Sequence, residues 1–194
     1  RGLELLVLSP NAPRPEIAHL WTSTETGTHI PVLRLVSRIL SIRRAIGEFA
    51  PDVVHGHGAF NYALWATLAG FPLTLVTCWG SDVLVAPSLS AINRAKVRRA
   101  LRAATYVTAT SQSLLDAATL LAGRPLRGEV LHWGVSVDVF TPIDRGSRTQ
   151  VTLLSLRAHK PLYNVDAIVR AFAALVDAGS PARLVVAHRG EETA

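Results

Sequence analysis

The chain has 194 residues, of which 49% are hydrophobic and 18% charged, so it can bury a substantial core. That composition excludes wholesale disorder, and no apolar run approaches the roughly 20 residues of a membrane-spanning helix. The formal net charge is +6, and nearly all of the positive charge comes from arginine, a residue suited to binding phosphates and carboxylates. The single cysteine, Cys78, excludes an internal disulfide and favours a reducing compartment such as the cytoplasm.

Apolar runs and helical patterns alternate along the first part of the chain, and a proline-rich loop at 11–16 and a threonine-rich loop at 22–31 lie between the first strand and the first helix. Ser88 or Ser90 is expected to cap the third of the helices, and Ser111 or Ser113 the fourth. The expected strands cover 3–10, 52–58, 73–77, 105–110 and 129–134, and the expected helices cover 33–49, 59–70, 91–104 and 111–123.

The alternation stops at a stretch rich in turn-forming residues and then restarts. We expect a linker at 141–149, a strand at 151–156, a helix at 165–179 capped by Asn164, and a strand at 182–188. The continuously apolar strands are typical of parallel strands covered on both faces. The sequence therefore predicts an α/β protein: a Rossmann-like, doubly wound domain over 1–140, then the first βαβ unit of a second Rossmann-like domain over 150–194.

Three of the expected strands end in unusual polar residues, and ligands of parallel α/β sheets bind at the carboxyl ends of strands. The first end reads HGHG, with His55 and His57 on one face of the strand. His57 could face a ligand, or both histidines could be hydrogen-bonded in a structural turn. A metal site is disfavoured because no further Cys, His or carboxylate side chain has suitable spacing.

The second strand end reads WGSD. Trp79 could form an apolar wall against a sugar ring, and Ser81 and Asp82 could hydrogen-bond sugar hydroxyls beyond a turn at Gly80. Alternatively, this is a capped loop before the next helix, with Trp79 in the core.

The third strand end carries Arg157 and Lys160, three residues apart and just before a helix. Two cations beside helix amides suit a diphosphate, although an ordinary solvated loop is the alternative. Neither a Walker loop nor a G-x-G-x-x-G loop occurs, so bound phosphates would be held by side chains.

The expected helix at 91–104 is strongly basic. Its face either contacts an anionic membrane or is merely solvated. The cations are Arg94, Lys96, Arg98, Arg99 and Arg102.

Five segments, taken together and in order, resemble family 4 of the glycosyltransferases, which are retaining enzymes of GT-B fold. The resemblance covers nearly the whole chain. Within the family, the chain is similar to a branch whose members carry WGSD. The segments are PDVVHGHGAF, LVTCWGSDVL, ATYVTATSQSLLDAA, VLHWGVSVDVFTP and LLSLRAHKPLYNVDAIVRAFAAL.

The resemblance implies transfer of a sugar from a nucleotide-diphosphate sugar to an acceptor hydroxyl, with retention and without a metal or other cofactor. It implies that Arg157 and Lys160 bind the donor phosphates, and that His57 and the segment Trp79, Gly80, Ser81 and Asp82 line the acceptor or sugar side. The acceptor would be a sugar or a lipid-linked molecule. Many members have His in place of Trp79, so no catalytic residue is assigned here.

The chain begins with Arg1 and lacks methionine, which predicts a fragment or a processed product. The family's first strand would precede it, and an acidic donor-binding motif would follow Ala194. Gly190 and Glu191 could form part of the donor side. On this basis the chain alone is expected to be inactive.

Two alternatives stay open: a GT-B-like nucleotide-sugar epimerase, and a non-catalytic nucleotide-sugar binding module. An NAD-linked dehydrogenase is disfavoured because the glycine fingerprint is missing. Nucleic-acid binding is disfavoured because the basic residues are spread over helices of an α/β frame.

Overall fold

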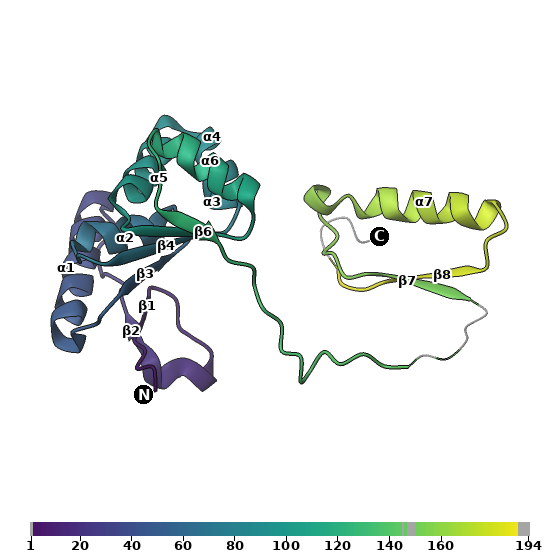
Figure 1. The fold of residues 1–194 in the computed structure, drawn as a ribbon, viewed down its shortest axis with the longest axis horizontal. Coiled ribbons are helices and arrows are strands. Elements are labelled where there is room, and N and C mark those ends of the chain that lie inside the picture. Colours follow the sequence, from purple (N-terminus) through teal and green to yellow (C-terminus); the bar gives the residue numbers. More distant parts are fainter. Residues whose placement is uncertain (1, 145, 147–149, 190–194) are drawn as a thin grey trace. The chain divides into compact units, whose positions relative to one another are not determined.

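The computed structural model describes residues 2–144, 146 and 150–189, and the chain divides into two compact units (Figure 1). Unit 1 spans Arg1–Gly134 and unit 2 spans Val135–Ala194. Both units combine helices with parallel strands, which confirms the α/β class predicted from the sequence. The predicted domain boundaries at 140 and 150 stay predictions.

Unit 1 is built on a four-stranded parallel sheet in the order β3-β4-β5-β6. Right-handed crossovers between parallel strands in sequential order place the connecting helices on one face of a sheet. The strands are β3 (Val54–His57), β4 (Thr74–Cys78), β5 (Tyr106–Ala109) and β6 (Gly128–Val130), and the main connecting helices are α2 (Asn61–Ala69), α5 (Ala91–Ala103) and α6 (Gln112–Ala122).

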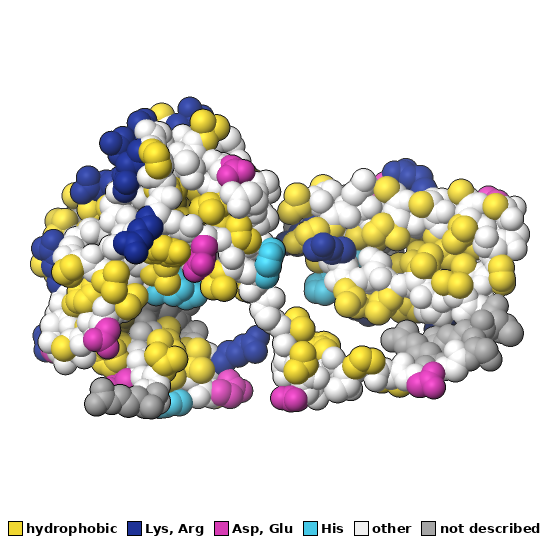
Figure 2. All heavy atoms as spheres, viewed as in Figure 1, with side chains coloured by type: hydrophobic (Ala, Val, Ile, Leu, Met, Phe, Trp, Pro, Cys, Tyr) yellow, Lys and Arg dark blue, Asp and Glu magenta, His cyan; other side chains and the backbone are white. Residues whose placement is uncertain are grey.

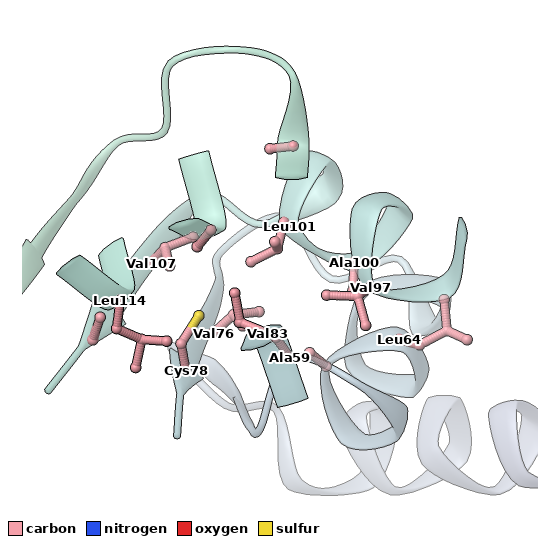
Figure 3. Packing of buried hydrophobic residues seen from close by; sticks show 14 residues of the cluster. Ala59, Leu64, Val76, Cys78, Val83, Val97, Ala100, Leu101, Val107 and Leu114 are labelled. Atoms are coloured by element: carbon pink, nitrogen blue, oxygen red, sulfur yellow. The ribbon is translucent and has the colours of Figure 1, made fainter. Parts of the chain in front are cut away.

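The core of unit 1 lies between this sheet and its helices (Figure 3). Val76 of β4 and Val107 of β5 are almost completely buried against Val97 and Leu101 of α5. On β4 the residues between the buried ones are only partly covered, as at Leu75. The expectation of strands covered on both faces is therefore not met at β4, because its crossover helices cover one face.

A second parallel pair joins β1 (Val7–Ser9) to β2 (Trp21–Ser23), with the 3-10 helix η1 (Pro15–Leu20) between them. The loop predicted from residue 22 was wrong at residues 22–23, which belong to β2. Their pairing with β1 is a long-range contact that the local sequence does not reveal. Helix α1 (Pro31–Phe49) follows and ends at Ala50, whose backbone is left-handed.

Two short helices follow β4, α3 (Ser81–Leu84) and α4 (Ala86–Leu89), and neither was predicted. A four-residue helix is too short to produce a hydrophobic period. Ser90 then caps α5 by accepting a hydrogen bond from the Asn93 amide at 3.1 Å. Ser111 caps α6 through the Leu114 amide at 3.3 Å. One of the two alternatives predicted for each cap is thus confirmed.

Unit 2 contains one parallel βαβ arrangement. Its elements are β7 (Val151–Ser155), the 3-10 helix η2 (Pro161–Tyr163), α7 (Val165–Asp177) and β8 (Ala182–Val186). The predicted side-chain cap at Asn164 was wrong, because this residue has φ 49° and ψ 46° and makes no side-chain cap bond. An N-cap side chain reaches the helix amides from an extended backbone, whereas Asn164 ends η2 in the left-handed region.

Candidate functional site

The carboxyl ends of β3 and β4 lie side by side in unit 1. The strands are parallel, and His57 pairs in register with Thr77. The HGHG and WGSD segments are therefore brought to the same sheet edge, as their positions after strands predicted. The end of β6 belongs to the same sheet, two strands away from β4.

The carboxylate of Asp82 ties these two segments together. Asp82 is 8% exposed, and its Oδ2 accepts the Ala59 amide at 2.5 Å. Its Oδ1 accepts the amides of Trp79 at 3.0 Å and Gly80 at 2.8 Å. The Asp82 side chain thus caps backbone amides, and a direct contact with an acceptor stays a prediction.

The turn at Gly80 sets the direction of the WGSD segment. Gly80 has φ 124° and ψ −77°, a conformation that side-chain-bearing residues rarely adopt. Ser81 begins α3 and is exposed. The turn therefore leaves the Ser81 residue on the surface while Asp82 turns inward.

Trp79 is 50% exposed, so the alternative that placed it in the core was wrong. Its ring lies at right angles to that of Trp133, with the two ring centroids 4.4 Å apart. Trp133 follows β6 and is 58% exposed. The His57 ring also stands edge-on to Trp79, with the two ring centroids 6.0 Å apart. Three rings from three strand ends thus form one exposed aromatic wall, defined here as His57, Trp79 and Trp133.

Sequence reasoning missed Trp133 as a site residue and assigned it only to an expected strand at 129–134. One signal could have found it: Trp133, like Trp79, is an aromatic residue close after the end of a strand, since β6 ends at Val130. Only the sheet order brings the two rings together, because 54 positions in the chain separate them.

Both histidines of the HGHG segment favour the neutral state. The pKa of His55 is lowered to about 4, mainly by burial and to a smaller extent by the neighbouring His57. Burial also lowers the pKa of His57. The two rings lie 4.0 Å apart, and His55 Nε2 lies 2.7 Å from the Thr77 hydroxyl. His55 is therefore hydrogen-bonded within the sheet, and His57 stands at the wall as a neutral ring near pH 7.

Of the two glycines in HGHG, Gly56 is required by the packing of the fold and not by the approach of a ligand. A Cβ on Gly56 would lie 2.7 Å from the Ala63 Cα, so Gly56 permits α2 to pack directly on β3. Gly58 has φ 88° and makes the turn that follows the strand. Within the described residues, no group of three or more His, Cys, Asp or Glu side chains is placed to hold a metal ion.

In unit 2, Arg157 and Lys160 are both exposed on the segment between β7 and η2. The Arg157 guanidinium lies over the Tyr163 ring, 5.3 Å from its centroid. The short η2 begins just after Lys160 and was not predicted, and the helix predicted at 165–179 follows it as α7. Gly190 and Glu191 lie outside the described residues, and the phosphate-binding role of the two cations stays a prediction.

The sequence profile of the glycosyl transferase 4-like family matches residues 1–111, more than half of the chain. The chain belongs to the glycosyl transferase 4-like family. The matched region contains β3, β4 and the WGSD segment, so His57 and Trp79 lie within it and Trp133 outside it. A search of curated proteins found no match.

Membership of the glycosyl transferase 4-like family indicates a transferase and, in general, binding of a nucleotide-sugar donor. It agrees with the family resemblance of the sequence and with the parallel α/β architecture. None of the helices in the described part of the chain is long and apolar enough to cross a bilayer.

Proposed function

We propose that this protein transfers a sugar from a nucleotide-diphosphate sugar to an acceptor hydroxyl with retention at the anomeric carbon. The observation that carries the proposal is the exposed, uncharged aromatic wall at the strand ends of unit 1, in which His57 and Trp79 belong to the family-matched region. The wall favours transfer over the two alternatives, because transfer needs a surface for an acceptor sugar in addition to the donor site. Neither nucleotide-sugar epimerisation nor simple binding needs such a second surface.

The aromatic wall suits the chemistry of a carbohydrate acceptor. The faces of a sugar ring present C–H groups that pack on indole rings, and the ring edges present hydroxyls that need hydrogen-bond partners. Trp79 and Trp133 supply the apolar surfaces, and neutral His57 supplies a group that can donate or accept a hydrogen bond. Asp82 directs its carboxylate at backbone amides, so its role is to hold the wall in shape.

On the donor side, the proposed receptor for the diphosphate is Arg157 with Lys160. During transfer the departing nucleoside diphosphate gathers negative charge, which fixed cations stabilise. The ring of Tyr163 beneath the Arg157 guanidinium restricts its motion and so reduces the entropy lost on binding. We extend this donor side to Gly190 and Glu191, and no metal or cofactor enters the scheme.

The donor assignment is tested by calorimetric titration of the protein with UDP, GDP and ADP and with their sugar conjugates. We expect one nucleotide series to bind, and Arg157→Ala with Lys160→Ala to weaken that binding by roughly a hundredfold, since each charged hydrogen bond contributes about 1.5–3 kcal/mol. Arg183→Ala, an exposed arginine on β8, is the matched control and should bind normally. Equal affinity in the double variant would refute the assignment.

The reaction itself is tested by product analysis of the full-length protein with the bound donor and a panel of saccharide acceptors. A glycoside that keeps the anomeric configuration of the donor is expected. Isomerised nucleotide sugar without an acceptor product would instead indicate an epimerase, and binding without turnover would indicate a binding module. We also propose a cytoplasmic location, because Cys78 is a buried free thiol.

A further inference from the structure

The solvent face of α5 in unit 1 is strongly cationic. The helix buries Val97 and Leu101 in the core, and its opposite face exposes Arg98, Arg99 and Arg102. The sequence of α5 contains no Asp or Glu, so the helix itself offers these guanidinium groups no partner. Figure 2 shows Lys and Arg side chains gathered over the region of α5, at the upper left of the view.

The three arginines surround a hollow rather than a flat surface. It has a volume of about 420 Å³ and is lined by the three arginines with Ala95 and Ala103. The small alanine side chains leave room between the long arginine side chains. Arg124, just after α6, adds a fourth cation, because its Nη2 donates to the Arg102 carbonyl at 2.7 Å. Both ion pairs described for the chain, Arg44–Glu48 and Arg170–Asp166, lie on other helices.

Large aliphatic side chains border the basic face. Ile92 of α5 is 69% exposed, and Leu89, at the end of α4, is 71% exposed. Arg94 Nε donates to the Pro87 carbonyl at 3.4 Å, which holds α4 against α5. Ile92 and Arg99 are seven positions apart, two helical turns, so they share one side of α5. Basic and aliphatic groups therefore form one continuous surface, the α4–α5 surface, made of Leu89, Ile92, Arg98, Arg99, Arg102 and Arg124.

We propose that the α4–α5 surface docks the protein on an anionic lipid bilayer. Lipid phosphates enter the hollow between the arginines, while Leu89 and Ile92 reach the boundary between headgroups and acyl chains. The aliphatic pair decides between a bilayer and a nucleic acid, because a phosphodiester backbone offers no apolar layer for two exposed aliphatic side chains. This inference does not depend on the proposed transfer reaction, but it would bring that reaction to lipid-linked acceptors.

The proposal is tested by co-sedimentation with vesicles of phosphatidylcholine alone and of phosphatidylcholine mixed with phosphatidylglycerol. We expect binding to the mixed vesicles only, weakening as salt is raised. Each removed arginine should lower the partition coefficient by about fivefold, so Arg98→Gln, Arg99→Gln and Arg102→Gln together should lower it by roughly a hundredfold. A control with Arg14→Gln, Arg34→Gln and Arg183→Gln removes equal charge from exposed positions elsewhere and should lose much less.

A second pair of variants tests the aliphatic contribution. Leu89→Ser with Ile92→Ser should weaken vesicle binding by about tenfold or more without changing net charge, whereas Leu162→Ser, 83% exposed in unit 2, should not. Unchanged thermal denaturation verifies that each variant is folded.

Three results would overturn the proposal: no binding of the wild-type chain to mixed vesicles, equal loss in the α5 and control triple variants, or binding that the aliphatic variant leaves intact. Binding to a random oligonucleotide, measured by fluorescence anisotropy, in place of vesicles would assign the surface to nucleic acid. Competition by inorganic phosphate at concentrations too low to act through ionic strength would assign the hollow to a free phosphate ligand. Either result contradicts bilayer docking.

Discussion

The Asp82 carboxylate accepts the backbone amide of Ala59 at 2.5 Å across two loops that are far apart in the sequence. Ala59 belongs to the turn between β3 and α2, and Asp82 to the first turn of α3. The same carboxylate also holds the amides of Trp79 and Gly80. One buried side chain therefore determines how the HGHG and WGSD segments meet, and with them the position of the aromatic wall.

Replacing Asp82 by Asn should destabilise unit 1 by about 2 kcal/mol, because the amide group keeps one acceptor oxygen and turns an NH₂ toward backbone donors. Urea denaturation followed by circular dichroism measures this change. Asp116→Asn is the control, since Asp116 lies on α6 and its carboxylate accepts from the exposed Gln112 side chain. A loss equal to that of the control would show that the three amide contacts contribute little.

Replacing Gly56 by Ala should destabilise the protein by about 1–3 kcal/mol, because the added Cβ would lie 2.7 Å from the Ala63 Cα. The neighbour is backbone and cannot rotate away. Gly47→Ala is the matched control on α1, where nothing lies within 4 Å of the added Cβ, and it should stabilise by about 0.5–1 kcal/mol. Opposite signs in thermal denaturation are the expected result, and two changes of the same sign would contradict the close packing of α2 on β3.

The free energy of unfolding should fall as the pH is lowered, and His55 should account for part of this fall. The folded pKa of about 4 lies below the unfolded value of 6.5, so the unfolded chain binds the proton first. The contribution of His55 is thus present above pH 6.5 and is lost as the pH falls toward about 4. Solvent reaches the exposed His55, so we expect on the order of 1 kcal/mol.

The measurement for His55 is the melting temperature as a function of pH. His55→Gln should show a shallower fall between about pH 7 and about pH 4 than the wild type, since carboxylates contribute equally to both. Identical slopes in the two proteins would exclude a role for His55.

Cys78 should be inert in the folded protein. Its side chain is completely buried, and burial, with a smaller effect of Asp82, raises the pKa of its thiol to about 12. The thiolate is the reactive form, so alkylation by iodoacetamide near neutral pH should be at least roughly a hundredfold slower than in the urea-unfolded chain. Fast labelling under native conditions would show that β4 opens easily.

The acceptor role of the aromatic wall is tested with Trp79→Ala and Trp133→Ala. In the full-length protein each should raise the acceptor KM by up to about tenfold and leave nucleotide affinity unchanged, because a stacking ring contributes about 0.5–1.5 kcal/mol. Trp65→Ala, on α2, is a tryptophan control outside the wall. A fall in nucleotide affinity without a change in acceptor use would place Trp79 on the donor side.

The sequence by itself determined the order of the longer helices and of the strands around them, the parallel α/β class and the family resemblance. Buried strands and amphipathic helices can be recognised from the spacing of their apolar residues. Ser90 and Ser111 mark the starts of helices because each caps an amide only three residues away. The same local logic found Trp79 and His57, because polar and aromatic residues at the end of a strand or directly after it are conspicuous.

Only the tertiary structure decided what depends on long-range contacts. Sheet order brought Trp133 to Trp79, and the carboxylate of Asp82 proved to be directed at the Ala59 amide. Crossovers to one face of the sheet left Leu75 partly exposed, and the backbone at Asn164 took a left-handed turn in place of a cap. Such outcomes depend on which elements pack together, a property that no local window of residues contains.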